Sequence, residues 1–159
     1  MPARTIQLGI DYGTSTSKMV FWDEQAAGKP KAYAISGQNG FRFPSSVAYI
    51  DDTLVFGDYP QKSVLPKETA WYESVKMRVA AEESTSCKRF CYGGVPKPPA
   101  ELTFADLAVL TIWQLRSLAT KCIAQKLSAR PSKVSVSVTT GIPRSFYESE
   151  PLRCRFFKI

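Results

Sequence analysis

The sequence predicts an α/β domain built on a mixed β-sheet, and three features of the chain lead to that expectation. Apolar and polar residues alternate over residues 5–10 and again over 133–140, which is typical of strands. A short polar turn after the first strand leads into a second apolar run, residues 18–22, which indicates an antiparallel hairpin. A long stretch of helical periodicity begins at residue 103, so the strand after it should lie parallel to its neighbour through a right-handed connection.

Shorter elements complete the first part of the chain. After a turn at residues 26–30, residues 31–36 are expected to form the third antiparallel strand of the main sheet. A strand over residues 43–50 is followed by a return strand over 53–56. The acidic pair between them predicts a small hairpin outside the main sheet.

The rest of the insertion is expected to be a helix followed by a loop. Residues 60–82 have helical spacing in two pieces, because Pro66 interrupts the pattern. Residues 84–100 are rich in Ser, Gly, Pro and charge, which favours a loop. The second helical piece carries on one face Trp71, Val75 and Val79.

The long helix has a recognisable start. Thr103 is the expected N-cap, and Asp106 three residues later completes a capping box. The helix ends before the Arg130-Pro131 pair. Its predicted core-facing residues are Phe104, Leu107, Ala108, Thr111, Leu115, Leu118 and Cys122.

The first turn of the chain has the composition of a phosphate site. Residues 8–18, LGIDYGTSTSK, place a glycine and several hydroxyl residues between two apolar strands. Gly13 lets the backbone come close to a ligand and take unusual torsions, and successive N–H groups in a tight turn form an anion-binding concavity. The hydroxyl groups of Thr14, Ser15 and Thr16 add further donors. The same composition also joins strands in proteins that bind no ligand.

Asp11 stands at the end of the strand that enters this turn. A carboxylate cannot usefully face a phosphate alone, so it implies a hydrated divalent cation between them, most readily Mg²⁺. The turn is not a Walker loop, because no Gly-Lys-Ser/Thr follows the required spacer. It is not a dinucleotide fingerprint either, because it holds one glycine and leads into a strand.

Composition excludes several classes of function. The chain of 159 residues is 44% hydrophobic, enough to fill one core, and it contains no histidine, which removes His-based triads and imidazole metal sites. Its four cysteines lack zinc-site spacing, and a disulfide framework is not expected. The net charge of +7 is spread along the chain, so we expect no nucleic-acid partner. Without a signal peptide or a membrane-length apolar run, a cytoplasmic protein with no membrane contact is expected.

The predicted order of elements is that of the first half of a ribonuclease-H-like subdomain, the unit of the actin-like ATPases. Four segments resemble, in order, the nucleotide-binding domain of the seventy-kilodalton heat-shock chaperones. They are residues 9–15 (GIDYGTS), similar to the phosphate-1 motif; 43–49 (FPSSVAY), similar to the Pro-Ser strand; 74–76 (SVK), similar to the segment of a catalytic lysine; and 134–143 (VSVSVTTGIP), similar to a connecting strand that ends in a hinge proline.

The resemblance implies roles for the residues of the turn. Gly13, Thr14, Ser15 and Thr16 would hold the β- and γ-phosphates of ATP. Asp11 would order the water shell of Mg²⁺. The domain would be the first lobe of an actin-like nucleotide-binding domain, with its core in residues 1–40 and 101–159 and an inserted hairpin-plus-helix lobe in residues 41–100.

The resemblance also implies roles outside the turn. Lys76 would offset charge on the transferred phosphoryl group and help to place the attacking water. Taken alone, Lys76 would be a solvated helix lysine, and Met77 stands where the family commonly has a basic residue. Pro143, acting with Arg144, would be a hinge that passes the nucleotide state to a partner surface. Taken alone, Pro143 is an ordinary strand stop.

Three functions are compatible with the sequence. The first is an ATP-binding, ATP-hydrolysing chaperone-like protein, of which this chain is an N-terminal fragment unable to turn over ATP without a second lobe. Its partners would be ATP, with unfolded polypeptide or a co-chaperone. The second is a sugar-kinase-like or reactivating ATPase of the same superfamily, which the Pro-Ser strand and the Lys76 segment disfavour. The third is a non-catalytic half-domain that binds a protein partner. The net positive charge and the early end of the chain favour this function.

Overall fold

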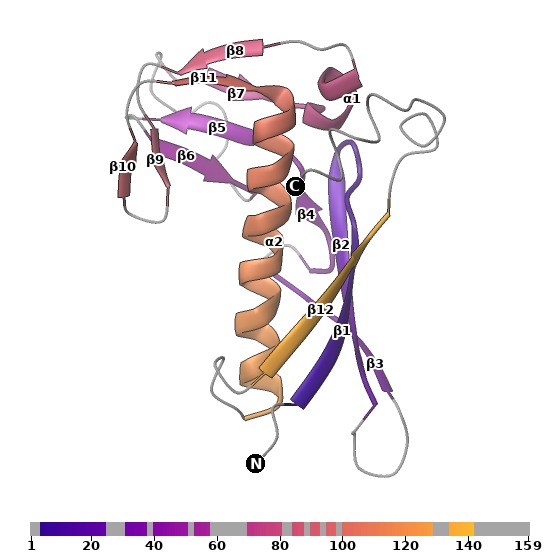
Figure 1. Ribbon diagram of the computed structural model, residues 1–159. Helices are drawn as coiled ribbons and strands as arrows, with labels where there is room; N and C mark the ends of the chain where they lie inside the picture. The colour runs from indigo at the N-terminus through magenta and orange to yellow at the C-terminus, as the bar shows by residue number, and fades with distance from the viewer. Residues whose placement is uncertain are drawn as a thin grey trace.

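The computed structural model describes residues 4–24, 31–37, 40–50, 53–57, 70–80, 84–87, 90–92, 95–97, 100–128 and 134–141. These residues form two separate five-stranded sheets, a two-stranded ladder and two helices. The long helix runs between the two larger sheets and is seen beside both of them in Figure 1. Pro143 and Arg144, the predicted hinge, and Pro66, the predicted helix interruption, lie outside the described residues.

The first sheet has the strand directions that the sequence predicts. Its order is β12-β1-β2-β3, in which β1 (Arg4–Asp11) and β2 (Thr16–Asp23) are antiparallel and β3 (Lys31–Ala34) is antiparallel to β2. β12 (Val134–Thr140) pairs parallel to β1 along seven residues, as expected of a strand reached through a crossover helix. The predicted strand over residues 43–50 is wrong as a single element. It breaks after β4 (Phe43–Pro44), which pairs with the start of β2.

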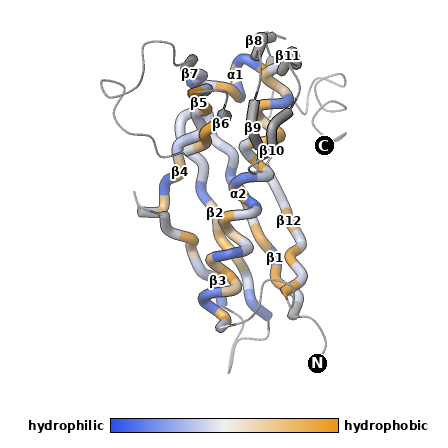
Figure 2. Tube along the Cα trace, turned by 90° about the vertical axis from the view of Figure 1, so that its left-hand side faces the viewer, coloured by the Kyte–Doolittle hydropathy of each residue, from blue (hydrophilic) through white to orange (hydrophobic). Residues whose placement is uncertain are grey.

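The core lies between this sheet and α2 (Phe104–Lys126). Burial alternates strictly along β2, which buries Ser17, Met19, Phe21 and Asp23. The helix buries on the facing side Phe104, Leu107, Ala108, Thr111, Leu115, Ala119, Ile123 and Ala124. Figure 2 shows the hydrophobic segments of α2 and of the strands next to it. The residues that share this core are Ile6, Leu8 and Ile10 from β1 and Tyr12 immediately after it.

The start of α2 is fixed as predicted. The Thr103 hydroxyl accepts from the N–H of Asp106 at 3.1 Å, and the Asp106 carboxylate accepts from the N–H of Thr103 at 2.8 Å. The predicted buried face is correct as far as Leu115 and wrong at Leu118, which is 36% exposed. Cys122 is half-buried and packs against the core. The buried stripe passes instead through Ala119, whose small side chain lets the helix approach the sheet closely.

The second sheet is larger than the predicted hairpin-plus-helix insertion. The expected hairpin is present as β5 (Val47–Ile50) and β6 (Thr53–Phe56), but the sheet order is β10-β9-β6-β5-β7. β7 (Ala70–Tyr72) pairs with β5, so the predicted helix is wrong at these residues. Residues 84–100, predicted as loop, contain β8 (Ser84–Cys87), β9 (Phe90–Tyr92) and β10 (Val95–Lys97), with β8 paired to β11 (Ala100–Thr103). β9 and β10 are neighbours in sequence, whereas β8 pairs with β11 and β9 with β6 across longer stretches of chain, which local periodicity does not register.

A short helix, α1 (Val75–Ala80), follows β7 in the chain and packs against the first turn of α2. Val75 and Val79 are buried as predicted. The guanidinium of Arg78 lies 3.9 Å from the centre of the Phe104 ring, and Tyr72 packs edge-on against the same ring at 5.7 Å. Among the described residues, no helix is both long and apolar enough to cross a membrane.

Candidate functional site

The turn between β1 and β2 is tight because residue 13 is a glycine. The last paired residues of the hairpin are Asp11 and Lys18, so the chain reverses within the residues between them. A Cβ atom on Gly13 would overlap the carbonyl oxygen of Thr16. Gly13 is not among the residues with positive φ, so the turn needs glycine for close approach and not for an unusual torsion.

The turn leaves donors available on its outer surface. Outside the strand ladders, no backbone hydrogen bond in the described part of the chain uses the N–H groups of Gly13, Thr14 or Ser15. Thr14 is half-buried, while Ser15 and Thr16 are exposed. Free N–H groups and hydroxyl groups on one tight turn are the donors that a phosphate oxygen requires.

The segment before β5 anchors the turn from the second sheet. The N–H of Ser45 donates to the carbonyl oxygen of Ser15 at 2.9 Å. The hydroxyl groups of Ser17 and Ser45 are 2.7 Å apart and fully buried. Two hydroxyl groups that satisfy each other in a buried position fix the relative placement of both segments. The phosphate-1-like and Pro-Ser-like segments are therefore in contact.

Lys76 also reaches the turn. Its Nζ donates to the carbonyl oxygen of Tyr12 at 2.6 Å, across 64 residues of sequence. The side chain is half-buried, so it differs from the solvated helix lysine that its sequence position alone predicts. An ammonium group held against the backbone of the turn adds positive potential where the free N–H groups lie.

A hollow of about 280 Å³ lies beside the turn and contains one residue, Glu73, that the sequence did not single out. It is lined by Thr14, Ser15, Ser46, Glu73 and Ser74. The indole N–H of Trp71 donates to Glu73 Oε1 at 2.9 Å, which helps to hold the carboxylate in place. A signal was present in the sequence, because this carboxylate immediately precedes the Lys76 segment.

Asp11 lies away from this hollow. The alternation of side chains puts it on the opposite face of β1 from Ile10 and Tyr12, and it is exposed. There it borders a second, largely apolar hollow of about 520 Å³ with Lys18 and Thr139. The structure thus brings Thr14 and Ser15 to one hollow and Asp11 to another at the base of the turn. Lys76 lines neither hollow and contacts the turn at the carbonyl oxygen of Tyr12. Thr16 lines neither hollow.

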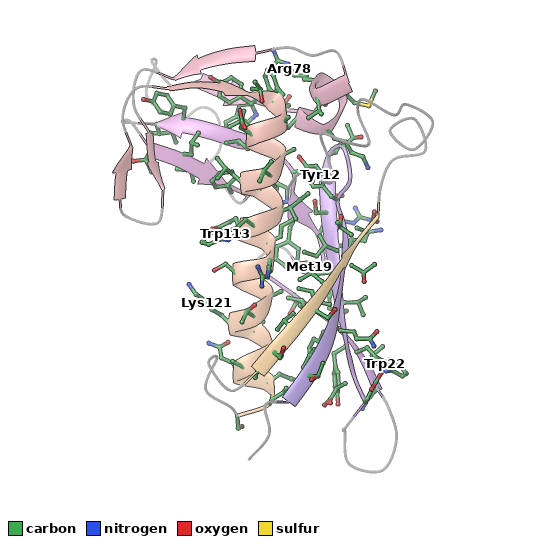
Figure 3. All side chains as sticks on the ribbon, in the orientation of Figure 1. Tyr12, Met19, Trp22, Arg78, Trp113 and Lys121 are labelled. Atoms are coloured by element: carbon green, nitrogen blue, oxygen red, sulfur yellow. The ribbon has the colours of Figure 1, made fainter. Side chains whose placement is uncertain are left out.

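Tyr12 connects the turn to the core. Its side chain is 1% exposed, and its hydroxyl group has no hydrogen-bond partner among the described residues. Burial raises the pKa of the phenol well above its ordinary value. The Thr111 hydroxyl donates to the carbonyl oxygen of Leu107 at 2.7 Å, so its proton is not available to Tyr12. Figure 3 shows Tyr12 between α2 and the top of the sheet.

The residues beside the turn fit a magnesium–phosphate group. Mg²⁺ takes oxygen ligands, keeps several waters and needs only one or two carboxylates when phosphates complete its shell. Glu73 offers one carboxylate for the water shell of the cation, and the hydroxyl and free N–H groups of the turn are donors for the phosphate oxygens. An all-protein cage is absent from the described residues, in which no three His, Cys, Asp or Glu side chains gather.

The chain was compared with known proteins. No protein-family model matches the sequence, and no curated protein matches it. The geometry of the turn and the four sequence motifs are therefore the basis for a functional assignment.

Proposed function

We propose that this chain is the first lobe of an actin-like, ribonuclease-H-like ATP-binding domain of the type found in the seventy-kilodalton heat-shock chaperones. In this proposal the turn at Gly13–Thr16 holds the terminal phosphates of Mg·ATP. The core of the lobe is residues 1–40 and 101–159, with residues 41–100 inserted. Hydrolysis of ATP, binding of an unfolded polypeptide or co-chaperone, and a cytoplasmic location belong to the proposal for the complete protein.

One observation carries the proposal. The sequence points to Lys76 only through the resemblance, whereas the composition of the turn indicates a phosphate site by itself. The ammonium group of Lys76 lies 2.6 Å from the carbonyl oxygen of Tyr12, next to that turn. A bound phosphate would compete for this ammonium group, because a charged oxygen is a stronger acceptor than a peptide carbonyl. Lys76 would then exchange the Tyr12 carbonyl for the ligand without a change of backbone.

The roles of the two carboxylates differ in this proposal. Glu73 lines the hollow with Thr14 and Ser15, so it is the nearer candidate for contact with the water shell of Mg²⁺. Asp11 lines the hollow at the base of the turn, so it orders the water shell of Mg²⁺ when the bound ligand extends across the end of β1. Bound magnesium would neutralise phosphate charge, while Lys76 and the turn orient the phosphate chain.

The test is a titration of the isotope-labelled chain with Mg·ATP, followed by backbone amide NMR shifts. One lobe of a two-lobed cleft should bind weakly, and amide shifts detect binding in the millimolar range. We expect the largest shifts at Gly13, Thr14 and Ser15, with Mg·tripolyphosphate reproducing them and adenosine leaving them unchanged. Shifts confined to other residues, or none at saturating nucleotide, would exclude the proposal.

Two variants with the same change of charge make the test specific. Lys76→Met should weaken the response of the turn amides to Mg·ATP about tenfold, because it removes a charge-assisted contact at the phosphates. Lys121→Met removes the same charge from the exposed face of α2 and should leave the titration unchanged. Equal responses from the two variants would mean that the net charge of the chain, and not Lys76, attracts the nucleotide.

A further inference from the structure

A hollow at the edge of the first sheet is separate from the turn. It measures about 560 Å³ and runs beside the consecutive residues Ala32–Ser36, which are the end of β3 and the two residues after it. Its other side is formed by the last turns of α2, through Cys122, Gln125 and Lys126. Phe41 closes one part of it and is 59% exposed. A groove between an edge strand and a helix is the shape in which extended peptides bind by adding a strand to a sheet.

The backbone of β3 is oriented to accept such a strand. β3 ends the sheet order and pairs with β2 alone among the described strands. The N–H of Ile35 donates to the carbonyl oxygen of Met19 at 3.0 Å, so Ile35 directs its backbone groups toward β2. Because direction alternates along a strand, Ala32 and Ala34 direct theirs to the open edge. Both alanines are exposed and have small side chains, which leave this edge accessible.

The electrostatics of the groove select the charge of the peptide. None of its described lining residues is acidic. Lys126 Nζ and Lys31 Nζ each lie 5.4 Å from the centre of the Tyr33 ring, so two ammonium groups gather at one part of the groove. The lining near Ile35, Phe41 and Cys122 is apolar or weakly polar. An added strand would alternately direct side chains into the groove, where an apolar residue and a carboxylate would both find partners.

We propose that the edge of β3 and the end of α2 form a binding groove for an extended acidic peptide of a protein partner, which adds a strand to the sheet. The inward positions of the peptide carry an apolar side chain over Ile35 and Phe41 and a carboxylate next to Lys126. Main-chain hydrogen bonds to Ala32 and Ala34 supply the pairing. The groove is distinct from the phosphate turn and does not depend on nucleotide binding.

The experiment measures affinity and backbone protection together. The probe is a fluorescein-labelled peptide, Thr-Val-Thr-Glu-Thr-Val-Thr-Glu, and its control replaces both Glu residues by Lys. By fluorescence anisotropy the acidic peptide should bind the chain at least tenfold tighter than the basic one. In hydrogen exchange the amides of Ala32 and Ala34 should exchange rapidly in the free chain and slowly with saturating acidic peptide. The amide of Ile35 should be slow in both states.

Two pairs of measurements can overturn the proposal. Lys126→Glu should weaken binding of the acidic peptide about tenfold, while Lys121→Glu, the same charge reversal elsewhere on α2, should not. Ala34→Pro removes an outward N–H without touching the ladder to β2 and should abolish binding, with folding checked by the unchanged exchange of Ile35. Equal affinity for both peptides, no binding up to millimolar concentration, or protection at amides other than those of Ala32 and Ala34 would each refute the groove.

Discussion

Replacement of Gly13 by alanine is the sharpest probe of the turn. The added Cβ would lie less than 3.0 Å from the carbonyl oxygen of Thr16. Real Cβ atoms essentially never approach another heavy atom that closely. The obstacle is backbone, not a flexible side chain, so the turn itself must open. Overpacking of this kind costs about 1–3 kcal/mol. Because Gly13 does not have a positive φ, alanine recovers about 0.4–1 kcal/mol through the unfolded chain.

The net expectation for Gly13→Ala is a loss of about 1–2 kcal/mol in the free energy of unfolding. For a chain of this length each kcal/mol lowers Tm by about 2–4 °C. Urea denaturation followed by circular dichroism measures the change directly. Gly9→Ala is the matched control, because its Cβ would lie 3.4 Å from Val20 Cγ1 and 3.8 Å from the Val20 carbonyl oxygen, which are both ordinary contacts.

The opened turn should also lose its response to Mg·ATP. The free N–H groups of Thr14 and Ser15 would no longer converge, so nucleotide-dependent amide shifts should weaken in Gly13→Ala and persist in Gly9→Ala. If Gly13→Ala matched Gly9→Ala in stability and in nucleotide response, the close approach of Gly13 to Thr16 would have no consequence, and the reasoning about the turn would be wrong.

Three further changes test the surroundings of the site. Ser45→Ala leaves the buried hydroxyl of Ser17 unpaired and should lower the free energy of unfolding, measured by urea denaturation, by about 1–3 kcal/mol. The double Ser17→Ala, Ser45→Ala variant should recover part of that loss. A double variant less stable than the sum of the single changes predicts would contradict the pairing. Tyr12→Phe removes a buried hydroxyl that has no partner among the described residues. Because the pKa of the Tyr12 phenol is higher in the folded chain than its unfolded value of 10.0, wild-type stability should be intact below pH 10.0 and fall as the pH rises above it. The Tyr12→Phe variant should show a flatter alkaline profile, and identical profiles would contradict the assignment. Thr103→Ala should lower the free energy of unfolding by about 1 kcal/mol through loss of the N-cap, while an unchanged midpoint would show that Asp106 alone caps α2.

The main strands of the first sheet were predictable because each carries a pattern of its own. Residues of β1 and β12 alternate in sequence, and β2 holds an apolar run that follows β1 directly. The second sheet was not predictable in this way, since β7 acquires its strand conformation by pairing with β5 more than twenty residues earlier. Helical spacing over the same residues was compatible with either structure, and tertiary pairing decided between them.

The candidate site was predictable only in part. The turn was evident from Gly13 and its hydroxyl neighbours, because those residue types favour a tight reversal between two strands. The position of Lys76 followed only from resemblance, as a lysine at the surface of a short helix carries no local signal. Glu73 was missed because its value depends on which hydroxyl groups lie opposite it, and that is a property of the folded chain.

The length of α2 has a consequence for how the chain unfolds. Its 23 residues span about 34 Å, and its first turn packs against Tyr72 and Arg78 while its later turns cover the other sheet. Neither sheet can unfold without exposing apolar side chains of α2 to water. The two sheets should therefore lose their structure in one cooperative step, and amides in the middle of α2 should report the global opening free energy.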